Sequence, residues 1–236
     1  MKDSTLECWY RLSYRGGKNT YKNNTDHHLL LRKKSSDGIN WSPRELIFDI
    51  TEKYKTELVS PSIIYQDYYY LWVVDAENDK YNHTVKLISS KDEISWSSPI
   101  QCVFCGPQLA PWHIDVSYID GFYWLVCYNT YGSLTLWKSH NKTHFQFIKT
   151  LLQPTYSDMS FYSNQLYRSS LCKVNDEDYR LYFSASNDSK TCIGVMKGTS
   201  METLEVYSVD NKDYQSFLFY LRSLLLRKFK TIVCSK

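Results

Sequence analysis

One short phrase occurs three times in this 236-residue chain and limits its fold more than any other feature. It spans Ser35–Trp41, Ser90–Trp96 and Ser139–Phe145, with the shared pattern Ser-x-Asp/Asn-x-x-x-aromatic. An Asp or Asn side chain can bind its own backbone two residues on, and the closing aromatic residue can pack into a core. Each copy therefore predicts a tight turn between two antiparallel strands. The return of the phrase after about 50 residues predicts one supersecondary unit used several times.

Apolar and aromatic runs around these turns predict four strands in each complete unit. The predicted first strands contain Ser60, His113 and Arg168, which return at nearly the same interval as the turns. An earlier unit over Leu6–Phe48 has a second, a third and a fourth strand but no first strand. Repeated units of four short strands are typical of β-propeller blades, whereas a β-sandwich gives no reason for its turn chemistry to repeat. We expect an all-β propeller over residues 1–208, with three complete blades and one partial blade.

Two details of this expectation concern packing. The fourth strand of the first complete unit is expected to run unbroken over Ile100–Phe104, beside the close cysteine pair Cys102 and Cys105. The closing aromatic residues of the three turns are expected to be core anchors. The seven cysteines are odd in number and scattered, which favours structural cysteines in a reduced compartment over a metal or redox site.

The last 26 residues break the pattern. Apolar residues recur at helical spacing over residues 211–236, which predicts an amphipathic helix. Six of the chain's Lys and Arg residues lie there against the single acid Asp213, so the formal net charge of +3 arises from this segment. A basic amphipathic helix can lie on an anionic membrane surface, dock on a protein partner, or cap its own domain. The sequence leaves these alternatives open.

Several classes of function are not supported by any pattern. There is no apolar run long enough to span a membrane and no apolar stretch near Met1 of the kind a signal peptide needs, so we expect a cytoplasmic protein. The sequence contains no glycine-rich phosphate loop, metal-binding histidine pair or serine-nucleophile elbow, and we expect neither a cofactor nor a metal. No nucleic-acid reader motif appears, so we expect no nucleic-acid partner.

Seven segments carry a resemblance to a known group of proteins. They are LECWYR (6–11), SSDGINWS (35–42), SPSIIY (60–65), PWHIDV (111–116), GFYWLV (121–126), LYRSS (166–170) and YRLYFSA (179–185). These segments resemble the five-bladed β-propellers of the glycoside hydrolase family 43 and 32 type, in a bacterial branch, with the N-terminal part shortened. The likeness covers roughly residues 5 to 200. It implies a sugar-facing site where the first strands converge, with three carboxylates from successive blades in the catalytic members.

Carried onto this chain, the carboxylate positions of that family fall on Ser62, Asp115 and Ser170. Only Asp115 is an acid, and it is the candidate catalytic residue. Hydrolysis of a glycosidic bond needs two carboxylates across the bond, so one of them is missing from these positions. Glu57, Asp75, Glu77 and Asp158 are further acids that can rim the site, but no spacing selects one of them.

The neighbours of Asp115 are candidate substrate-binding residues. Trp112 and His113 can stack on a sugar ring and bind its hydroxyl groups, and Ser60, Ser62 and Ser170 offer hydroxyl groups on the same strands. Tyr167 and Arg168 can clamp a carboxylate or phosphate of an acidic glycan, since the guanidinium fork fits that geometry. An ion pair between Asp115 and Arg168 is an equally open structural alternative.

Three hypotheses of function follow from these residues. The first is a glycoside hydrolase-like enzyme that acts on a bacterial surface polysaccharide. The second is a degenerate propeller that binds glycan without cleaving it, which the count of carboxylates favours. The third is a truncated scaffold whose segment 211–236 associates with a membrane surface or a protein partner.

Overall fold

The computed structural model describes residues 5–15, 26–54, 58–76, 82–154, 161–187 and 190–207. The chain divides into two compact units, Met1–Glu205 and Val206–Lys236. The sheets belong to the first unit, and the helix predicted over residues 211–236 lies outside the described residues. Within the described ranges, no helix is long and apolar enough to cross a membrane.

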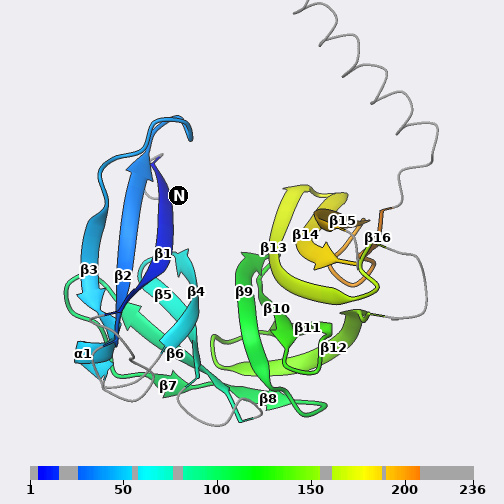
Figure 1. The fold of residues 1–236 in the computed structure, drawn as a ribbon, viewed down its shortest axis with the longest axis horizontal. Coiled ribbons are helices and arrows are strands. Elements are labelled where there is room, and N and C mark those ends of the chain that lie inside the picture. Colours follow the sequence, from blue (N-terminus) through cyan, green and yellow to red (C-terminus); the bar gives the residue numbers. More distant parts are fainter. Residues whose placement is uncertain are drawn as a thin grey trace, which may run out of the picture. The chain divides into compact units, whose positions relative to one another are not determined.

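Four sheets follow one another along the first unit, and we call them the first to fourth blades (Figure 1). The first blade has three strands: β1 (Leu6–Arg15), β2 (Asp26–Ser35) and β3 (Glu45–Asp49), followed by the short helix α1 (Ile50–Tyr54). The second blade has β4 (Leu58–Tyr65), β5 (Tyr69–Asp75), β6 (Thr84–Ser90) and β7 (Ile100–Gln101). The third has β9 (Pro111–Ile119), β10 (Phe122–Asn129), β11 (Leu134–Ser139) and β12 (His144–Leu152), with β8 (Val103–Cys105) added at its outer edge. The fourth has β13 (Gln165–Asn175), β14 (Asp178–Ser186), β15 (Thr191–Gly198) and β16 (Glu205–Val206).

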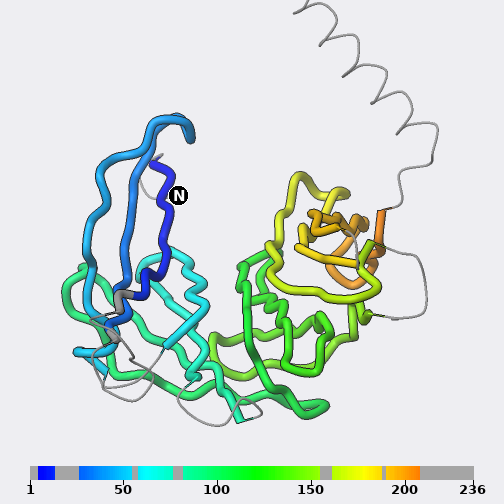
Figure 2. The backbone as a smooth tube through the Cα atoms, viewed as in Figure 1, coloured from blue at the N-terminus to red at the C-terminus, as the bar shows by residue number. Residues whose placement is uncertain are grey.

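The chain is therefore an all-β propeller, with three complete blades and one blade that lacks a strand, as the sequence predicts. The resemblance implies five blades, and this is corrected: the strands of the described residues suffice for four. Figure 2 traces the backbone from one blade to the next in chain order. Consecutive strands within each blade pair antiparallel with one another, as strands close together in the chain usually do.

The repeated phrase forms the predicted turn in all three copies, between β2 and β3, β6 and β7, and β11 and β12. Asp92 Oδ1 accepts the backbone N–H groups of Ile94 at 2.9 Å and Ser95 at 2.7 Å. Asp37 and Asn141 accept the two equivalent bonds at 2.7–3.0 Å. These N–H donors stabilise a negative charge, and they lower the pKa of Asp92 to about 2.

The closing aromatic residues of the turns differ in burial. Trp96 is 8% exposed and Phe145 is fully buried, as predicted, but Trp41 is 39% exposed. Trp96 lies 6.2 Å from the ring of Trp9 in the first blade, and Phe145 stacks at 5.3 Å on Phe104, which follows the second blade. Trp96 thus packs against the blade before its own, and Phe145 lies in the core layer that its blade shares with Trp72 and Leu87 of the second blade. The expectation for Trp41 was wrong, because no described blade precedes the first.

The strand predicted over Ile100–Phe104 is divided, and this expectation was also wrong. Cys102 turns its side chain into the core and donates its N–H to Val85 of the second blade at 2.8 Å. From Val103 onward the chain pairs instead with β12, in parallel. Phe104 gains its stacking partner in the third blade through this change of sheet, while Cys105 faces solvent.

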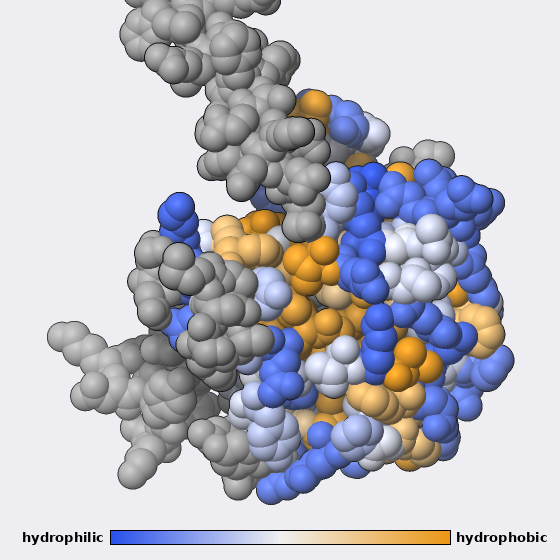
Figure 3. Space-filling model, turned by 90° about the vertical axis from the view of Figure 1, so that its right-hand side faces the viewer, coloured by the Kyte–Doolittle hydropathy of each residue, from blue (hydrophilic) through white to orange (hydrophobic). Residues whose placement is uncertain are grey.

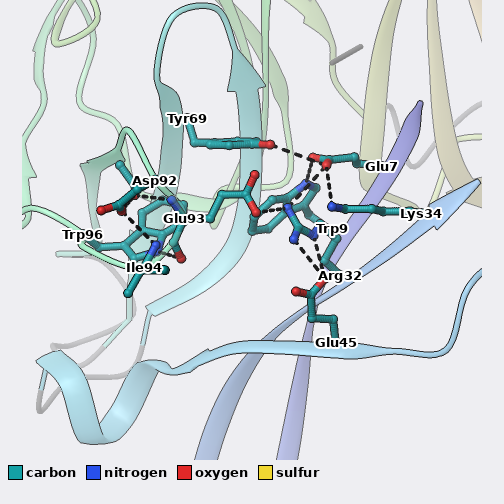
Figure 4. Close-up of polar contacts among 11 residues, drawn as sticks. Glu7, Trp9, Arg32, Lys34, Glu45, Tyr69, Asp92, Glu93, Ile94 and Trp96 are labelled. Atoms are coloured by element: carbon teal, nitrogen blue, oxygen red, sulfur yellow. Dashed lines mark hydrogen bonds and ion pairs between the residues drawn. The ribbon is translucent and has the colours of Figure 1, made fainter. Parts of the chain in front are cut away.

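A buried arginine joins the first blade to the turn of the second (Figure 4). The side chain of Arg32 is 2% exposed and lies 3.3 Å from Glu7, 2.9 Å from Glu45 and 2.6 Å from Glu93. Glu93 adopts a left-handed backbone with φ of +67°, at the turn position that Gly38 occupies in the first copy. A side chain is costly in that conformation, and its ion pair with Arg32 offsets the cost.

The core lies in layers between consecutive blades. One layer, between the first and second blades, contains Leu30, Ile50, Leu58, Tyr69, Leu71, Val73, Ile88 and Trp96. Another, between the second and third, is built around Trp72, Val74, Leu87, Leu125, Trp137 and Phe145. In the fourth blade β14 and β15 bury one face and expose the other, where Tyr182 and Ile193 lie, the latter 70% exposed. Figure 3 views the molecule from the right-hand side of Figure 1 and shows apolar groups among polar ones.

Candidate functional site

The first strands of the three complete blades are joined by side chains that accept backbone hydrogen bonds. On β4, Ser60 Oγ accepts the N–H of Ile114 at 3.1 Å and Ser62 Oγ accepts the N–H of Val116 at 2.8 Å. These hydroxyl groups sit between β4 and β9, so the first strands of neighbouring blades lie side by side. The predicted convergence of these strands is thus present in the structure.

Asp115 repeats the bond of Ser62 one blade later. Its Oδ2 accepts the N–H of Leu171 on β13 at 2.7 Å, and Ser62 Oγ donates to its Oδ1 at 3.5 Å. Burial raises the pKa of the Asp115 carboxyl group to about 6, against the opposing effect of these two bonds. Asp115 therefore has a structural partner in the next blade. The ion pair with Arg168, one of the two alternatives, is not formed between these two described residues.

Ser170 is exposed on β13, at the position that Ser62 and Asp115 occupy in the preceding blades. The next residue, Leu171, donates its N–H to Asp115. In the same way Val116, the residue after Asp115, donates its N–H to Ser62. The equivalence of the three positions that the sequence predicts is thus present in the hydrogen bonding. Asp115 is the single carboxylate among them.

All three complete blades carry an irregularity near the start of the first strand. The pairing of β4 with β5 shifts register between Val59 and Ser62, and that of β13 with β14 shifts between Leu166 and Ser169. The pairing of β9 with β10 shifts at the point where β9 faces Tyr128 and Asn129. β-Bulges of this kind re-aim side chains and are common beside active sites.

Ser60 lies within the first of these irregularities and has a left-handed backbone with φ of +51°. In β13 the Ser184 hydroxyl pins the bulge, since it accepts the N–H of Arg168 at 3.0 Å and donates to the carbonyl of the same residue at 3.3 Å. Tyr167 and Arg168, the bulged pair, are both exposed although they are consecutive in a strand. The bulge therefore gives two adjacent side chains to the same site.

Aromatic rings gather where these irregularities meet. The ring of His113 lies 4.4 Å from that of Tyr167, edge to face, and 6.3 Å from the parallel ring of Tyr128. Trp112 stacks at 5.1 Å on His83, whose Nδ1 donates to a backbone carbonyl on β9. We call these five residues the aromatic cluster. Sequence reasoning selected Trp112, His113 and Tyr167.

Sequence reasoning missed His83 and Tyr128. Tyr128 pairs directly with His113 in the β9–β10 hairpin, so its position follows from the hairpin register once the turn at Asp120–Gly121 is placed. His83 comes from the loop before β6. No local signal in the sequence marks this residue.

His113 holds a buried polar atom without a partner. The residue is 8% exposed, and its Nε2 makes no hydrogen bond with any described residue. Its Nδ1 lies 3.4 Å from Ser60 Oγ, which already accepts the N–H of Ile114. The Ser60 proton is satisfied if Nδ1 accepts it, and the hydrogen of the neutral ring is then on Nε2. A buried N–H donor without an acceptor is costly and marks a position where a ligand atom can bind.

The electrostatics around His113 are those of a neutral ring among cations. Burial, followed by the charges of Arg168 and Arg11, lowers its pKa to about 4. Arg11 lies on β1, and its Nη1 is 3.0 Å from Nδ1 of His28. His113 is therefore uncharged at neutral pH.

Of the other acids considered, Asp75 is described. It is buried at the end of β5 and pairs with Lys86 at 2.5 Å, so it is part of the second blade. Glu57, Glu77 and Asp158 lie outside the described residues. The structure thus brings one carboxylate, Asp115, to the first strands of the described blades.

Comparisons with known proteins fit this architecture. No family model matches the chain. The chain is 26% identical over 215 residues to an A type blood N-acetyl-α-D-galactosamine deacetylase from Flavonifractor plautii, which covers 77% of this chain and 28% of that protein. It thus spans little more than a quarter of that relative's length.

Solved structures show the same fold at low identity. An N-acetylgalactosamine deacetylase from F. plautii, in complex with blood group B trisaccharide, has a TM-score of 0.57 at 19% identity, over 86% of this chain and 71% of that one. A glycosyl hydrolase from Bacteroides ovatus has a TM-score of 0.61 at 14% identity, over 87% of this chain and 67% of that one. These likenesses support the β-propeller fold.

Proposed function

We propose that this chain is a carbohydrate-active propeller that binds a glycan, of the bacterial surface polysaccharide class, at the aromatic cluster. The observation that carries the proposal is the buried Nε2 of His113, which has no hydrogen-bond partner among the described residues and lies among four other rings. Sugars offer apolar ring faces beside many hydroxyl acceptors, and aromatic side chains beside a fixed donor complement both.

The relatives support the same class of ligand. The deacetylase and the glycosyl hydrolase named above both act on carbohydrates by their names, and one was solved with a trisaccharide. Sites in folds of repeated blades form where the inner strands meet, which is where the aromatic cluster lies here. The three coincident irregularities of the first strands add support, because backbone strain collects at functional sites.

A second candidate, an enzyme, is favoured by one observation. The pKa of Asp115, raised to about 6, is suited to a group that gives and takes a proton near neutral pH. Against this, both of its oxygens already bind neighbours, and the equivalent positions Ser62 and Ser170 cannot supply the second carboxylate. Binding is therefore the function that the geometry supports best.

The experiment is a glycan-array screen of the full chain and of two variants, His113→Phe and Asp115→Asn. Phe keeps the ring packing of His113 but removes the Nε2 donor, and Asn keeps an acceptor for Leu171 but removes the acid. We expect wild-type binding to a set of glycans, loss of that binding in His113→Phe, and little change in Asp115→Asn.

Each bound glycan is then incubated with the protein and analysed for cleaved or deacetylated products. Products that disappear in Asp115→Asn would replace the binding proposal with the enzyme candidate. The absence of binding to every glycan, from a protein with a cooperative unfolding transition, would overturn both.

A further inference from the structure

We propose that the sugar bound at the aromatic cluster carries an oxyanion group, and that Arg168 holds this group beside Tyr167 and His113. The inference rests on the proposed function and narrows it, since it names the class of carbohydrate that the same site takes. An oxyanion group here means a carboxylate, as in uronic or sialic acids, or a sulfate or phosphate ester.

The position of Arg168 is the first argument. The β13 bulge turns Arg168 and Tyr167 to the same side, and Ser184 fixes the backbone there through two hydrogen bonds. The guanidinium carbon lies 5.9 Å from the centre of the Tyr167 ring, which in turn lies 4.4 Å from the ring of His113. Tyr167 thus contacts both the guanidinium group and the ring that carries the unpaired nitrogen.

The second argument is that Arg168 has no carboxylate partner among the described residues. Arg32 and Arg180 each pair with at least one carboxylate, at 2.5–3.3 Å. Among the described residues, no carboxylate pairs with Arg168, and the nearest acid of the first strands, Asp115, is engaged by Leu171. An arginine held at a site by a bulge, with its five donors left for a ligand, is suited to bind an oxyanion in a two-pronged manner.

The third argument is the sign of the local field. Among the described residues, the charges of Arg168 and Arg11 both lower the pKa of His113, after the larger effect of burial. His113 itself is neutral above its pKa of about 4, so it contributes a donor without competing charge. A ligand with negative charge is complementary to the charge of Arg168 beside this neutral ring.

The test uses matched pairs of sugars that differ only in charge. Oligosaccharides that end in glucuronic acid or N-acetylneuraminic acid are compared with their methyl esters, and sulfated galactosides with their unsulfated parents. Affinities are measured by titration calorimetry with wild type, Arg168→Gln and the control Arg44→Gln. Arg44 is exposed in the loop before β3, away from the aromatic cluster, and its substitution makes the same change of net charge.

We expect wild type to bind at least one acidic sugar about 10- to 100-fold more tightly than its neutral partner, the range of a charge-assisted hydrogen bond. Arg168→Gln should lose this preference, while Arg44→Gln should behave as wild type. Preference for the carboxylate pair or for the sulfate pair identifies which oxyanion the site takes.

Two results would overturn the inference. Equal affinity of wild type for both members of every pair would leave the proposed function in place and remove the role of charge. An acidic preference that survives in Arg168→Gln would place the oxyanion elsewhere. Failure of the proposed function is distinct from both, because no sugar of either kind would then bind.

Discussion

Asp92 and Asp115 are the same residue type in two regions of the protein, and their pKa values move in opposite directions. Asp92, in the turn of the second blade, is exposed and accepts backbone N–H groups, so its pKa falls to about 2. Asp115, on the first strand of the third blade, is partly buried between blades, and desolvation raises its pKa to about 6. In the turn, the backbone N–H groups that Asp92 accepts stabilise its charged form, and the same hydrogen bonds hold the turn together. On the first strand of the third blade, desolvation makes the charged form of Asp115 less stable.

The same contrast holds for the repeats as a whole. The three turns keep one set of residues and one pattern of hydrogen bonds. The first strands keep the bonds between blades but change the side chains, from Ser62 to Asp115 to Ser170. The turns are therefore alike in all three copies and specify the fold. The first strands differ in their side chains from blade to blade, and these side chains form the candidate site.

The largest expected effect on stability is at the junction between the first blade and the second turn. Arg32→Gln should lower the free energy of unfolding by about 3–5 kcal/mol, because it leaves Glu7 and Glu93 without their buried cation. Urea unfolding measures the change. Glu45→Gln is the control, since this carboxylate is half exposed and should cost about 1 kcal/mol or less. Equal losses in the two variants would contradict the account.

The closing aromatic residues of the turns should differ in the same measurement. Phe145→Ala removes a fully buried ring and should cost about 3–5 kcal/mol. Trp41→Ala removes a larger ring that is 39% exposed and packs on no described blade before its own, and should cost about 1 kcal/mol. A loss for Trp41→Ala as large as that for Phe145→Ala would show that the turns do not depend on the blade before them.

The two aspartates can be compared through pH. Because the pKa of Asp115 rises from 3.8 to about 6 on folding, the folded state binds a proton more tightly between these values. Its contribution to stability is present below about pH 4 and is lost as pH rises through 6. Asp115→Asn should therefore be more stable than wild type at pH 8 by about 1–3 kcal/mol, with a smaller difference at pH 5. Urea unfolding at both pH values checks this, and a difference that does not change with pH would refute the burial of the charge.

His113 provides the opposite pH window. Its pKa falls from 6.5 to about 4 on folding, so its contribution to stability is present above about pH 6.5 and is lost on acidification toward pH 4. Variant Asp115→Asn should retain this acid loss, which separates the two groups in one series of experiments.

The smallest effect is expected for Asp92→Asn. The third turn already has an asparagine, Asn141, at the equivalent position. Its side-chain oxygen accepts the two equivalent backbone N–H groups, so Asn at position 92 can make the same hydrogen bonds. The midpoint of thermal unfolding should change little, while Asp92→Ala, which lacks the acceptor, should lower it by several degrees. Equal midpoints for Asn and Ala would mean that the hydrogen bonds of the turn do not stabilise it.

The sequence predicted what depends on local chemistry. The three turns, the missing strand of the first blade and the equivalence of Ser62, Asp115 and Ser170 all follow from residues close together in the chain or from the period of the repeat. The division of Ile100–Phe104 between two sheets does not, because the stacking of Phe104 on Phe145 decides it.

The site was predicted in part for the same reason. Trp112, His113 and Tyr167 were selected from their place on first strands, and their rings lie in the aromatic cluster, with Arg168 in contact with Tyr167; their role in binding stays a prediction. The unpaired Nε2 of His113 appears only after three blades are assembled, since its surroundings come from separate strands. The exposure of Trp41 likewise depends on which part of the molecule packs against the first blade. The residues of the turn itself do not show this.

The central claim is that the aromatic cluster binds sugar through the donor of His113. The most direct measurement is calorimetric titration of the best array glycan into wild type and His113→Phe, with urea unfolding of both proteins. We predict that affinity falls about tenfold or more in the variant, as expected for the loss of a buried hydrogen bond, with stability equal to or above that of wild type. Unchanged affinity in a stable His113→Phe would contradict the claim.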